Sequence, residues 1–142
     1  MPDVFHWIEV RAFCHPTEQE DRVRKAIETA APGAPIRADP VESHFGPPLI
    51  VLTARIEDTE AKKAFGRSLK GVNGFERLID TIRDRVDDDC VMHFRLDKQR
   101  AFSGELALVD HDDVLSVRAK VASFPAKRNE AAKRAKAFLA GM

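Results

Sequence analysis

Four consecutive side chains in the middle of the chain have the chemistry to contact a polyanion: Asp97, Lys98, Gln99 and Arg100. Lys and Arg donate hydrogen bonds to anionic oxygens, and the Gln amide both donates and accepts. The residues on either side alternate between apolar and polar types. A period of two predicts two strand segments, so the four residues are expected at the tip of a hairpin. Turn chemistry alone accounts for Asp97, whereas the other three are candidate ligand contacts.

Three other strands are predicted over 4–13, 49–56 and 114–124, with the same alternation. If helices cover their apolar face, the opposite face displays rings and cations: Trp7, Arg11, Phe13, Arg55, Arg95, Arg118 and Lys120. Aromatic rings stack on unpaired bases while Lys and Arg meet phosphates, so this mixture predicts a surface for single-stranded RNA. A homodimer partner, another protein or a loop could instead cover the same rings, because monomers rarely expose large apolar patches.

Positive charge is concentrated toward the C-terminus. From Arg118 onward there are seven basic residues against Glu130 alone, although the whole chain is balanced at 23 basic and 23 acidic residues. Lys133, Arg134 and Lys136 share one arc of a helix predicted over 126–139, where they would extend the electrostatic reach toward phosphate. A solvated helix surface explains the same three residues without any ligand.

Catalytic and metal-binding patterns are weak. Cys14 and His15 resemble a nucleophile and its base, but neighbours in a strand point to opposite faces. The acidic turns at 87–89 and 110–113 have ligands suited to Mg²⁺, yet the five histidines show no paired spacing for zinc. We therefore expect no catalytic residue, no metal site and no cofactor, and the protein is predicted not to be an enzyme.

Length and composition favour one domain over residues 1–142, since 44% of the residues are hydrophobic. Cys14 and Cys90 are too few for a disulfide scaffold, and the chain has no apolar leader or membrane-length apolar run. The expected location is the cytoplasm, without membrane contact.

The predicted fold is α+β: a two-layer arrangement of an antiparallel sheet with helices packed on one face, in the order β-α-β-β-α-α-β-β-β-α. Thr17 and Glu20 have the spacing of a capping box and predict a helix start. Apolar stripes at helical spacing predict two further helices over 61–69 and 75–86. Short links between strands indicate antiparallel pairing, and single apolar stripes indicate one helix layer.

Three segments resemble an archaeal family of RNA-binding proteins that is also described as predicted exosome subunits: HWIEVRAF followed by PTE, SHFGPP, and RLDKQ followed by an aromatic residue, Gly and Glu. The second segment departs from the family pattern, since His44-Phe45-Gly46-Pro47-Pro48 stands where Tyr-Gly-Asn-Pro is expected. The resemblance implies a fold like that of the large-subunit ribosomal protein that binds 5S rRNA. His44 and Phe45 could stack on a base, although packing on their own prolines is the alternative.

The function predicted from the residues and the resemblance together is that of a non-enzymatic RNA-binding protein in RNA processing or in exosome- or ribosome-related assembly. Its expected partners are RNA and exosome or ribosomal components. The alternative is a protein interaction module or homodimer that uses the exposed sheet face. The predicted RNA contacts are Trp7, Arg11, Phe13, His44, Phe45, Arg95, Lys98, Gln99, Arg100, Arg118, Lys120, Lys133, Arg134 and Lys136.

Overall fold

The computed structural model describes residues 4–41, 49–123 and 127–140. Its elements in chain order are β1 (Phe5–Cys14), α1 (Glu20–Ala30), β2 (Ile36–Val41), β3 (Leu49–Ile56), α2 (Thr59–Leu69), α3 (Phe75–Asp80), α4 (Ile82–Arg85), β4 (Val91–Asp97), α5 (Lys98–Phe102), β5 (Val114–Val121) and α6 (Arg128–Ala140). Within these residues, no helix is long and apolar enough to span a bilayer.

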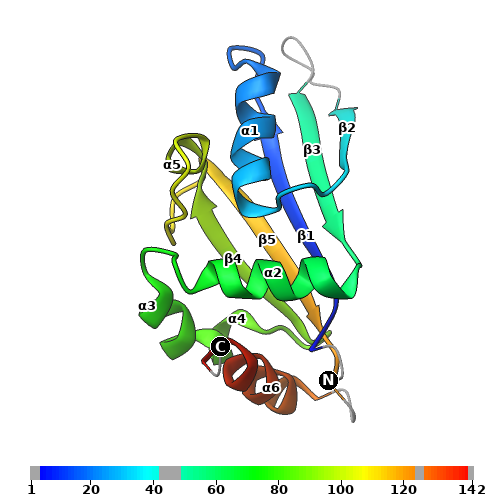
Figure 1. The fold of residues 1–142 in the computed structure, drawn as a ribbon, viewed down its shortest axis with the longest axis vertical. Helices are drawn as coiled ribbons and strands as arrows, with labels where there is room; N and C mark the ends of the chain where they lie inside the picture. Colours follow the sequence, from blue (N-terminus) through cyan, green and yellow to red (C-terminus); the bar gives the residue numbers. More distant parts are fainter. Residues whose placement is uncertain (1–3, 42–48, 124–126, 141–142) are drawn as a thin grey trace.

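The strands form one five-stranded sheet in the order β2-β3-β1-β5-β4, and every neighbouring pair is antiparallel. Helices lie against one face of this sheet: α1 runs along the strands and α2 crosses in front of them (Figure 1). The central strand β1 places Val10 between Ala54 of β3 and Val117 of β5. The predicted α+β class, with one helix layer on an antiparallel sheet, is confirmed.

Alternating apolar residues of the strands build the core under the helices. Ile8, Val10 and Leu52 are fully buried, as are Val23 and Ile27 on the inner stripe of α1. Burying each such side chain contributes about 1.5–3 kcal/mol relative to exposure. One sheet face is therefore buried in the core. The polar residues that alternate with the buried ones along each strand lie on the other face.

A β-bulge near the start of β1 changes the face on which Phe5 lies. Alternation predicts Phe5 on the same face as Trp7, but the pairing with β5 shifts register between these two residues. Phe5 is therefore buried in the core, where it packs edge-on against Phe138 with ring centroids 5.6 Å apart. The buried Lys62 ammonium donates to the Phe5 carbonyl at 2.8 Å and stabilises the bulged backbone.

Two helix boundaries also differ from the predictions. The capping box at Thr17 is not formed: α1 begins at Glu20 after Gln19, whose side chain makes no capping hydrogen bond. The helix predicted over 75–86 is divided at Thr81 into α3 and α4. The Thr81 hydroxyl donates to the Arg77 carbonyl at 2.6 Å, and hydroxyl bonds of this kind are known to bend helices.

The hairpin strand predicted over 102–108 is not formed. Residues Lys98–Phe102 form the short helix α5 instead, because the Asp97 carboxylate accepts a hydrogen bond from the Arg100 amide at 2.9 Å and caps the turn. Beyond it, the chain returns to the edge of β4 through a single bridge between Leu96 and Leu108. The tip is therefore a capped helical turn between β4 and this return segment.

Gly74, which precedes α3, has a backbone conformation and a close neighbour that both oppose a side chain at this position. Its φ is +97°, and a Cβ added there would lie 3.0 Å from the Leu108 Cβ. We expect Gly74→Ala to lower the free energy of unfolding by about 1–3 kcal/mol, since positive φ and close contact both oppose a side chain. Gly71→Ala is the matched control, because its Cβ meets only an ordinary contact at 3.6 Å. Equal urea midpoints for the two variants would contradict this reading.

Candidate nucleic-acid interface

We call the second sheet face the open face. Of the described helices, only α4 and the start of α6 border a groove on it. Strand register places six cations on it, Arg11, Arg37, Arg55, Arg95, Arg118 and Lys120, against three carboxylates, Glu9, Asp39 and Asp97. This face is therefore more positive than the neutral chain as a whole. Alternation in the sequence predicted its main members correctly.

Three arginines of the open face converge on one carboxylate. Glu9 lies directly opposite Arg55 of β3 and Arg118 of β5. Its oxygens lie 3.0 Å from Arg55, 3.8 Å from Arg118 and 3.7 Å from Arg11 of its own strand. We call Arg11, Arg55 and Arg118 the arginine cluster. Glu57 also pairs with Arg55, at 2.6 Å, so two carboxylates offset two of the three charges. One positive charge therefore remains in excess, on side chains that are more than 40% exposed.

Trp7 is placed on the open face as predicted, but its ring is already engaged. The Arg55 guanidinium lies 4.6 Å from the Trp7 ring centroid, and that of Arg118 lies 5.7 Å away. These are cation–π distances. Lys120 is paired with Trp7 across the strands and donates to the Asp89 carbonyl. Trp7 therefore orders the cluster, and a base would have to displace an arginine to stack on its ring.

Phe13 has a freer ring. It is 46% exposed, and Val41 is the one other large hydrophobic residue of the described chain that is exposed to this degree. Phe13 lies two positions from Arg11 on the same strand face, opposite Val51. The predicted aromatic surface is therefore small, and its accessible ring lies at the end of β1.

A groove of about 700 Å³ runs over the open face between β1 and the segments beyond β4. Its floor includes Arg11, Arg95, Arg118 and Phe13, and its outer rim carries Asp84, Asp87, Asp88 and Asp110. Arg95 is partly neutralised at this side, since it donates to the His111 carbonyl at 3.3 Å and to Asp112 at 3.4 Å. Positive charge is thus strongest toward β3, β1 and β5, and carboxylates border the β4 side.

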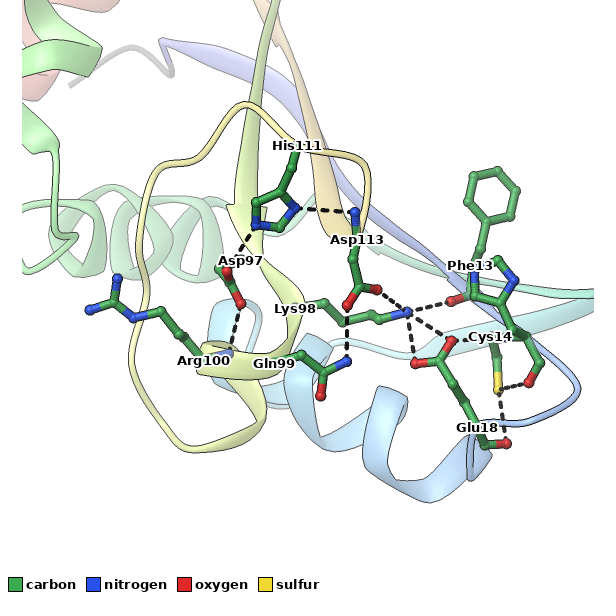
Figure 2. Close-up of polar contacts among 10 residues, drawn as sticks. Phe13, Cys14, Glu18, Asp97, Lys98, Gln99, Arg100, His111 and Asp113 are labelled. Carbon is green, nitrogen blue, oxygen red and sulfur yellow. Dashed lines mark hydrogen bonds and ion pairs between the residues drawn. The ribbon is translucent and has the colours of Figure 1, made fainter.

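The side chain of Lys98 is buried, whereas the sequence predicted it at an exposed hairpin tip. Its side chain is only 4% exposed, and its ammonium contacts the Phe13 carbonyl at 3.1 Å, Glu18 at 2.8 Å and Asp113 at 2.8 Å (Figure 2). With these partners it has no free donor to offer a ligand, and the predicted contact with RNA does not fit this placement. Lys98 instead joins the end of β1, the start of α1 and the turn before β5.

The neighbours of Lys98 extend this network, which we call the Lys98 network. The Gln99 amide donates to Asp113 at 3.1 Å, and the His111 ring lies 3.0 Å from the Asp97 carboxylate (Figure 2). The Arg100 guanidinium pairs with Glu105. Gln99 and Arg100 remain exposed, so they keep surface donors, but their present contacts hold the helical turn of α5 in place.

The remaining predicted RNA contacts do not lie on the described part of the open face. Lys133, Arg134 and Lys136 are exposed on α6, which packs on α2, α3, α4 and β5 in the helix layer. RNA on the open face would reach them only around the edge of the sheet. Arg128, which the sequence reading did not select, lines the groove at the start of α6. His44 and Phe45 lie outside the described residues.

The candidate catalytic and metal patterns have structural roles here. Cys14 is buried, and burial followed by the charge of Glu18 raises the pKa of its thiol, which disfavours a reactive thiolate. The Asp87 carboxylate accepts the Asp89 and Val91 amides and pairs with His93 at 2.8 Å. Within the described ranges, no group of three or more His, Cys, Asp or Glu residues is arranged to hold a metal ion.

The Lys98 network predicts how stability depends on pH. Burial alone would raise the pKa of Asp113, but hydrogen bonds from Lys98 and Gln99 lower it below its usual value. Burial likewise would lower the pKa of Lys98, but its carboxylate partners raise it. A carboxylate with a lowered folded pKa stabilises above its unfolded pKa of about 3.9, and this contribution is lost as the pH falls through the folded pKa. The Lys98 contribution is present below about pH 10.4 and is lost as the pH rises through its raised pKa.

We therefore expect the free energy of unfolding, measured with urea across a pH series, to be flat near neutral pH and to fall at both extremes. In Asp113→Asn the fall on the acid side should be shallower than in the unmodified protein, because one carboxylate with a lowered pKa is gone. Superimposable acid limbs would show that Asp113 does not carry this dependence.

Comparison with known proteins identifies the family of the chain. Residues 7–121 match the RNA-binding family. The chain is 32% identical over 145 residues to the RNA-binding protein PAB1135 of Pyrococcus abyssi, with 96% of this chain and 94% of that protein covered.

Two solved structures of DUF54 proteins, each 30% identical in sequence, have the same fold. Protein AF2318 of Archaeoglobus fulgidus has a TM-score of 0.85 over 94% of this chain and 99% of its own, and Mth689 of Methanothermobacter thermautotrophicus has 0.83 over 96% and 99%. The resemblance of the three sequence segments is confirmed, and the chain belongs to the RNA-binding family.

Proposed function

We propose that the protein binds RNA on its open face and that the arginine cluster supplies the main phosphate contacts. The observation that carries this proposal is the convergence of three arginines on the carboxylate of Glu9, on a face where these arginines stay more than 40% exposed although Glu57 also pairs with Arg55. Guanidinium groups bind phosphate oxygens in bidentate geometry. An RNA phosphate can therefore take up the donors that Glu9 leaves unused.

The distribution of charge gives this RNA a path. Asp84, Asp87, Asp88 and Asp110 border the groove beside β4 and outnumber Arg85 and Arg128 there, so this side repels phosphate. The cations of β3, β1 and β5 attract it. The backbone of a bound strand should therefore run over β3, β1 and β5 and stay clear of the β4 edge.

A homodimer through the open face is less well supported. A two-fold interface presents the same patch on both subunits, so arginines would be buried close to arginines. Phe13 and Val41 are the large hydrophobic residues exposed within the described ranges, and they form a small apolar area for an interface core. Analytical sedimentation tests this second candidate. It would be favoured if the purified protein sediments as a dimer and the Phe13→Asp variant as a monomer.

The cellular setting we propose is RNA processing or exosome- or ribosome-related assembly, with no catalysis by this chain and a cytoplasmic location. Family membership and the name of the Pyrococcus relative support an RNA-directed, non-enzymatic role. Co-purification of exosome or ribosomal components that survives dilution and is lost in arginine-cluster variants is the expected result. Recovery of the same components with the variants would argue against this setting.

The direct test of the function is titration of labelled single-stranded and hairpin RNA at two salt concentrations. Three phosphate contacts predict a slope of about −2 in log affinity against log salt, which is roughly a 15-fold loss between 50 and 200 mM salt. Absence of binding at the lower salt concentration, or binding that is insensitive to salt, would refute the proposal.

A further inference from the structure

We infer that the open face takes single-stranded RNA, with one unpaired base stacked on the ring of Phe13 and the adjacent phosphate on Arg11. This inference rests on the proposed RNA binding and specifies the form of RNA that binds. It differs from the reading of the sequence alone, which gave Trp7 and Phe13 equal roles as stacking platforms.

The two aromatic side chains of the open face are in different states. Arg55 and Arg118 lie against the ring of Trp7, at 4.6 and 5.7 Å from its centroid. Among the described residues, no ring or cation stacks on Phe13, which is 46% exposed. A base reaching Trp7 must break existing contacts, whereas a base reaching Phe13 displaces no ring or cation of the described residues. Phe13 is therefore the stacking site that is open to a ligand.

The backbone of Phe13 is fixed by strand pairing and by a hydrogen bond to its carbonyl. Its strand position is paired with Val51, and its carbonyl accepts from the buried Lys98 ammonium at 3.1 Å. Lys98 is in turn fixed by Glu18 and Asp113, and the Phe13 ring points away from this network (Figure 2). A ring fixed before binding loses little conformational entropy when a base stacks on it.

Arg11 lies in position to meet the phosphate beside that base. It is two residues from Phe13 on the same face of β1, which separates the two Cα atoms by about 7 Å. Its side chain is 43% exposed, and its contact with Glu9 is long, at 3.7 Å. Its Nε is buried and makes no hydrogen bond within the described structure, so the terminal nitrogens are the donors that a phosphate could reach. Unlike Arg55 and Arg118, Arg11 does not lie over the Trp7 ring. It is also the member of the arginine cluster nearest to Phe13 along the chain.

The groove that holds both residues excludes a duplex as the preferred ligand. Its volume of about 700 Å³ is within the range of sites that enclose one small ligand. In a double helix the base faces are stacked on one another and only edges, sugars and phosphates are accessible. An exposed ring on the groove floor therefore gains nothing from a duplex, while a single strand can place a base on it.

The test uses a short single-stranded RNA containing 2-aminopurine, whose fluorescence is quenched by stacking, and a duplex of the same sequence. We expect the protein to quench the single strand and to bind it more tightly than the duplex. Phe13→Leu keeps the apolar volume but removes the ring, so affinity for the single strand should fall about tenfold and quenching should be lost. The salt slope should be unchanged.

Phe102→Leu is the matched control, because that ring lies on α5 and already carries Arg22 and Lys25 at 4.2 and 4.9 Å. It should bind and quench like the unmodified protein. Unchanged quenching in Phe13→Leu, or equal affinity for duplex and single strand, would overturn this inference while leaving RNA binding intact. Failure of the unmodified protein to bind either RNA would overturn both proposals.

Discussion

The double variant Arg55→Gln, Arg118→Gln binds single-stranded RNA about 20-fold more weakly than the unmodified protein at 0.1 M salt, if each arginine meets one phosphate. The same estimate lowers the salt slope by about 1.4. Arg11 is retained as a partner for Glu9, so this carboxylate, which is only 13% exposed, is not left unpaired. Fluorescence anisotropy at several salt concentrations measures both quantities.

The control for this variant removes the same charge from the helix layer. Arg24→Gln, Lys63→Gln alters two side chains of α1 and α2 that make surface ion pairs within their helices. Its affinity and salt slope should stay close to those of the unmodified protein. Similar losses in both double variants would mean that RNA responds to net charge alone and would remove the open face from the proposal.

Glu9 provides a change with the opposite sign. Glu9→Gln removes the carboxylate that the three arginines share, so one more positive charge becomes available to phosphate, and affinity should rise about fivefold at 0.1 M salt. A gain of binding is difficult to produce by damage to the fold. Weaker binding by a folded Glu9→Gln protein would contradict this prediction. It would show that the carboxylate contacts RNA or that the arginine cluster needs it to keep its arrangement.

Lys98→Met should have the largest effect on stability. Removing the ammonium leaves Glu18 and Asp113 close together without the cation that both contact. Loss of one partner of a buried ion pair costs about 3–5 kcal/mol; because these carboxylates are 22% and 46% exposed, we expect about 2–3 kcal/mol. The melting temperature should fall by roughly 6–12 °C, measured by calorimetry.

Lys133→Met separates this effect from the general loss of a lysine. Lys133 is 74% exposed and forms only a long surface pair with Glu130, so its replacement should change stability by less than about 0.5 kcal/mol. If Lys98→Met melts within a degree or two of Lys133→Met, the ammonium is not the structural centre of the Lys98 network.

Alternation in the sequence was sufficient to identify which residues share the open face. Trp7, Arg11 and Phe13 lie on it as predicted because side chains alternate strictly along a regular strand. Phe5 was misplaced because a β-bulge adds a residue and inverts the alternation before it. No residue type in the sequence marks that bulge, which is stabilised by Lys62 from a helix far along the chain.

The role of Lys98 could not be read from its neighbours. Its carboxylate partners are Glu18, 80 residues earlier in the chain, and Asp113, which follows a separate turn. A single sequence contains no sign that these segments meet. Asp97 gave a local signal that was available, since Asp is a preferred N-cap residue; weighing it above the alternation would have predicted α5 in place of a hairpin tip.

The carboxylate of Glu9 also bears on how long a complex would last. Because it already occupies the centre of the three guanidinium groups, an arriving phosphate competes with a resident anion that is covalently part of the protein. The Glu9 carboxylate can re-form its ion pairs with the arginines as soon as a phosphate moves away. This shortens the residence time of a bound strand more than it slows association. Such a surface is suited to passing from one transcript to the next.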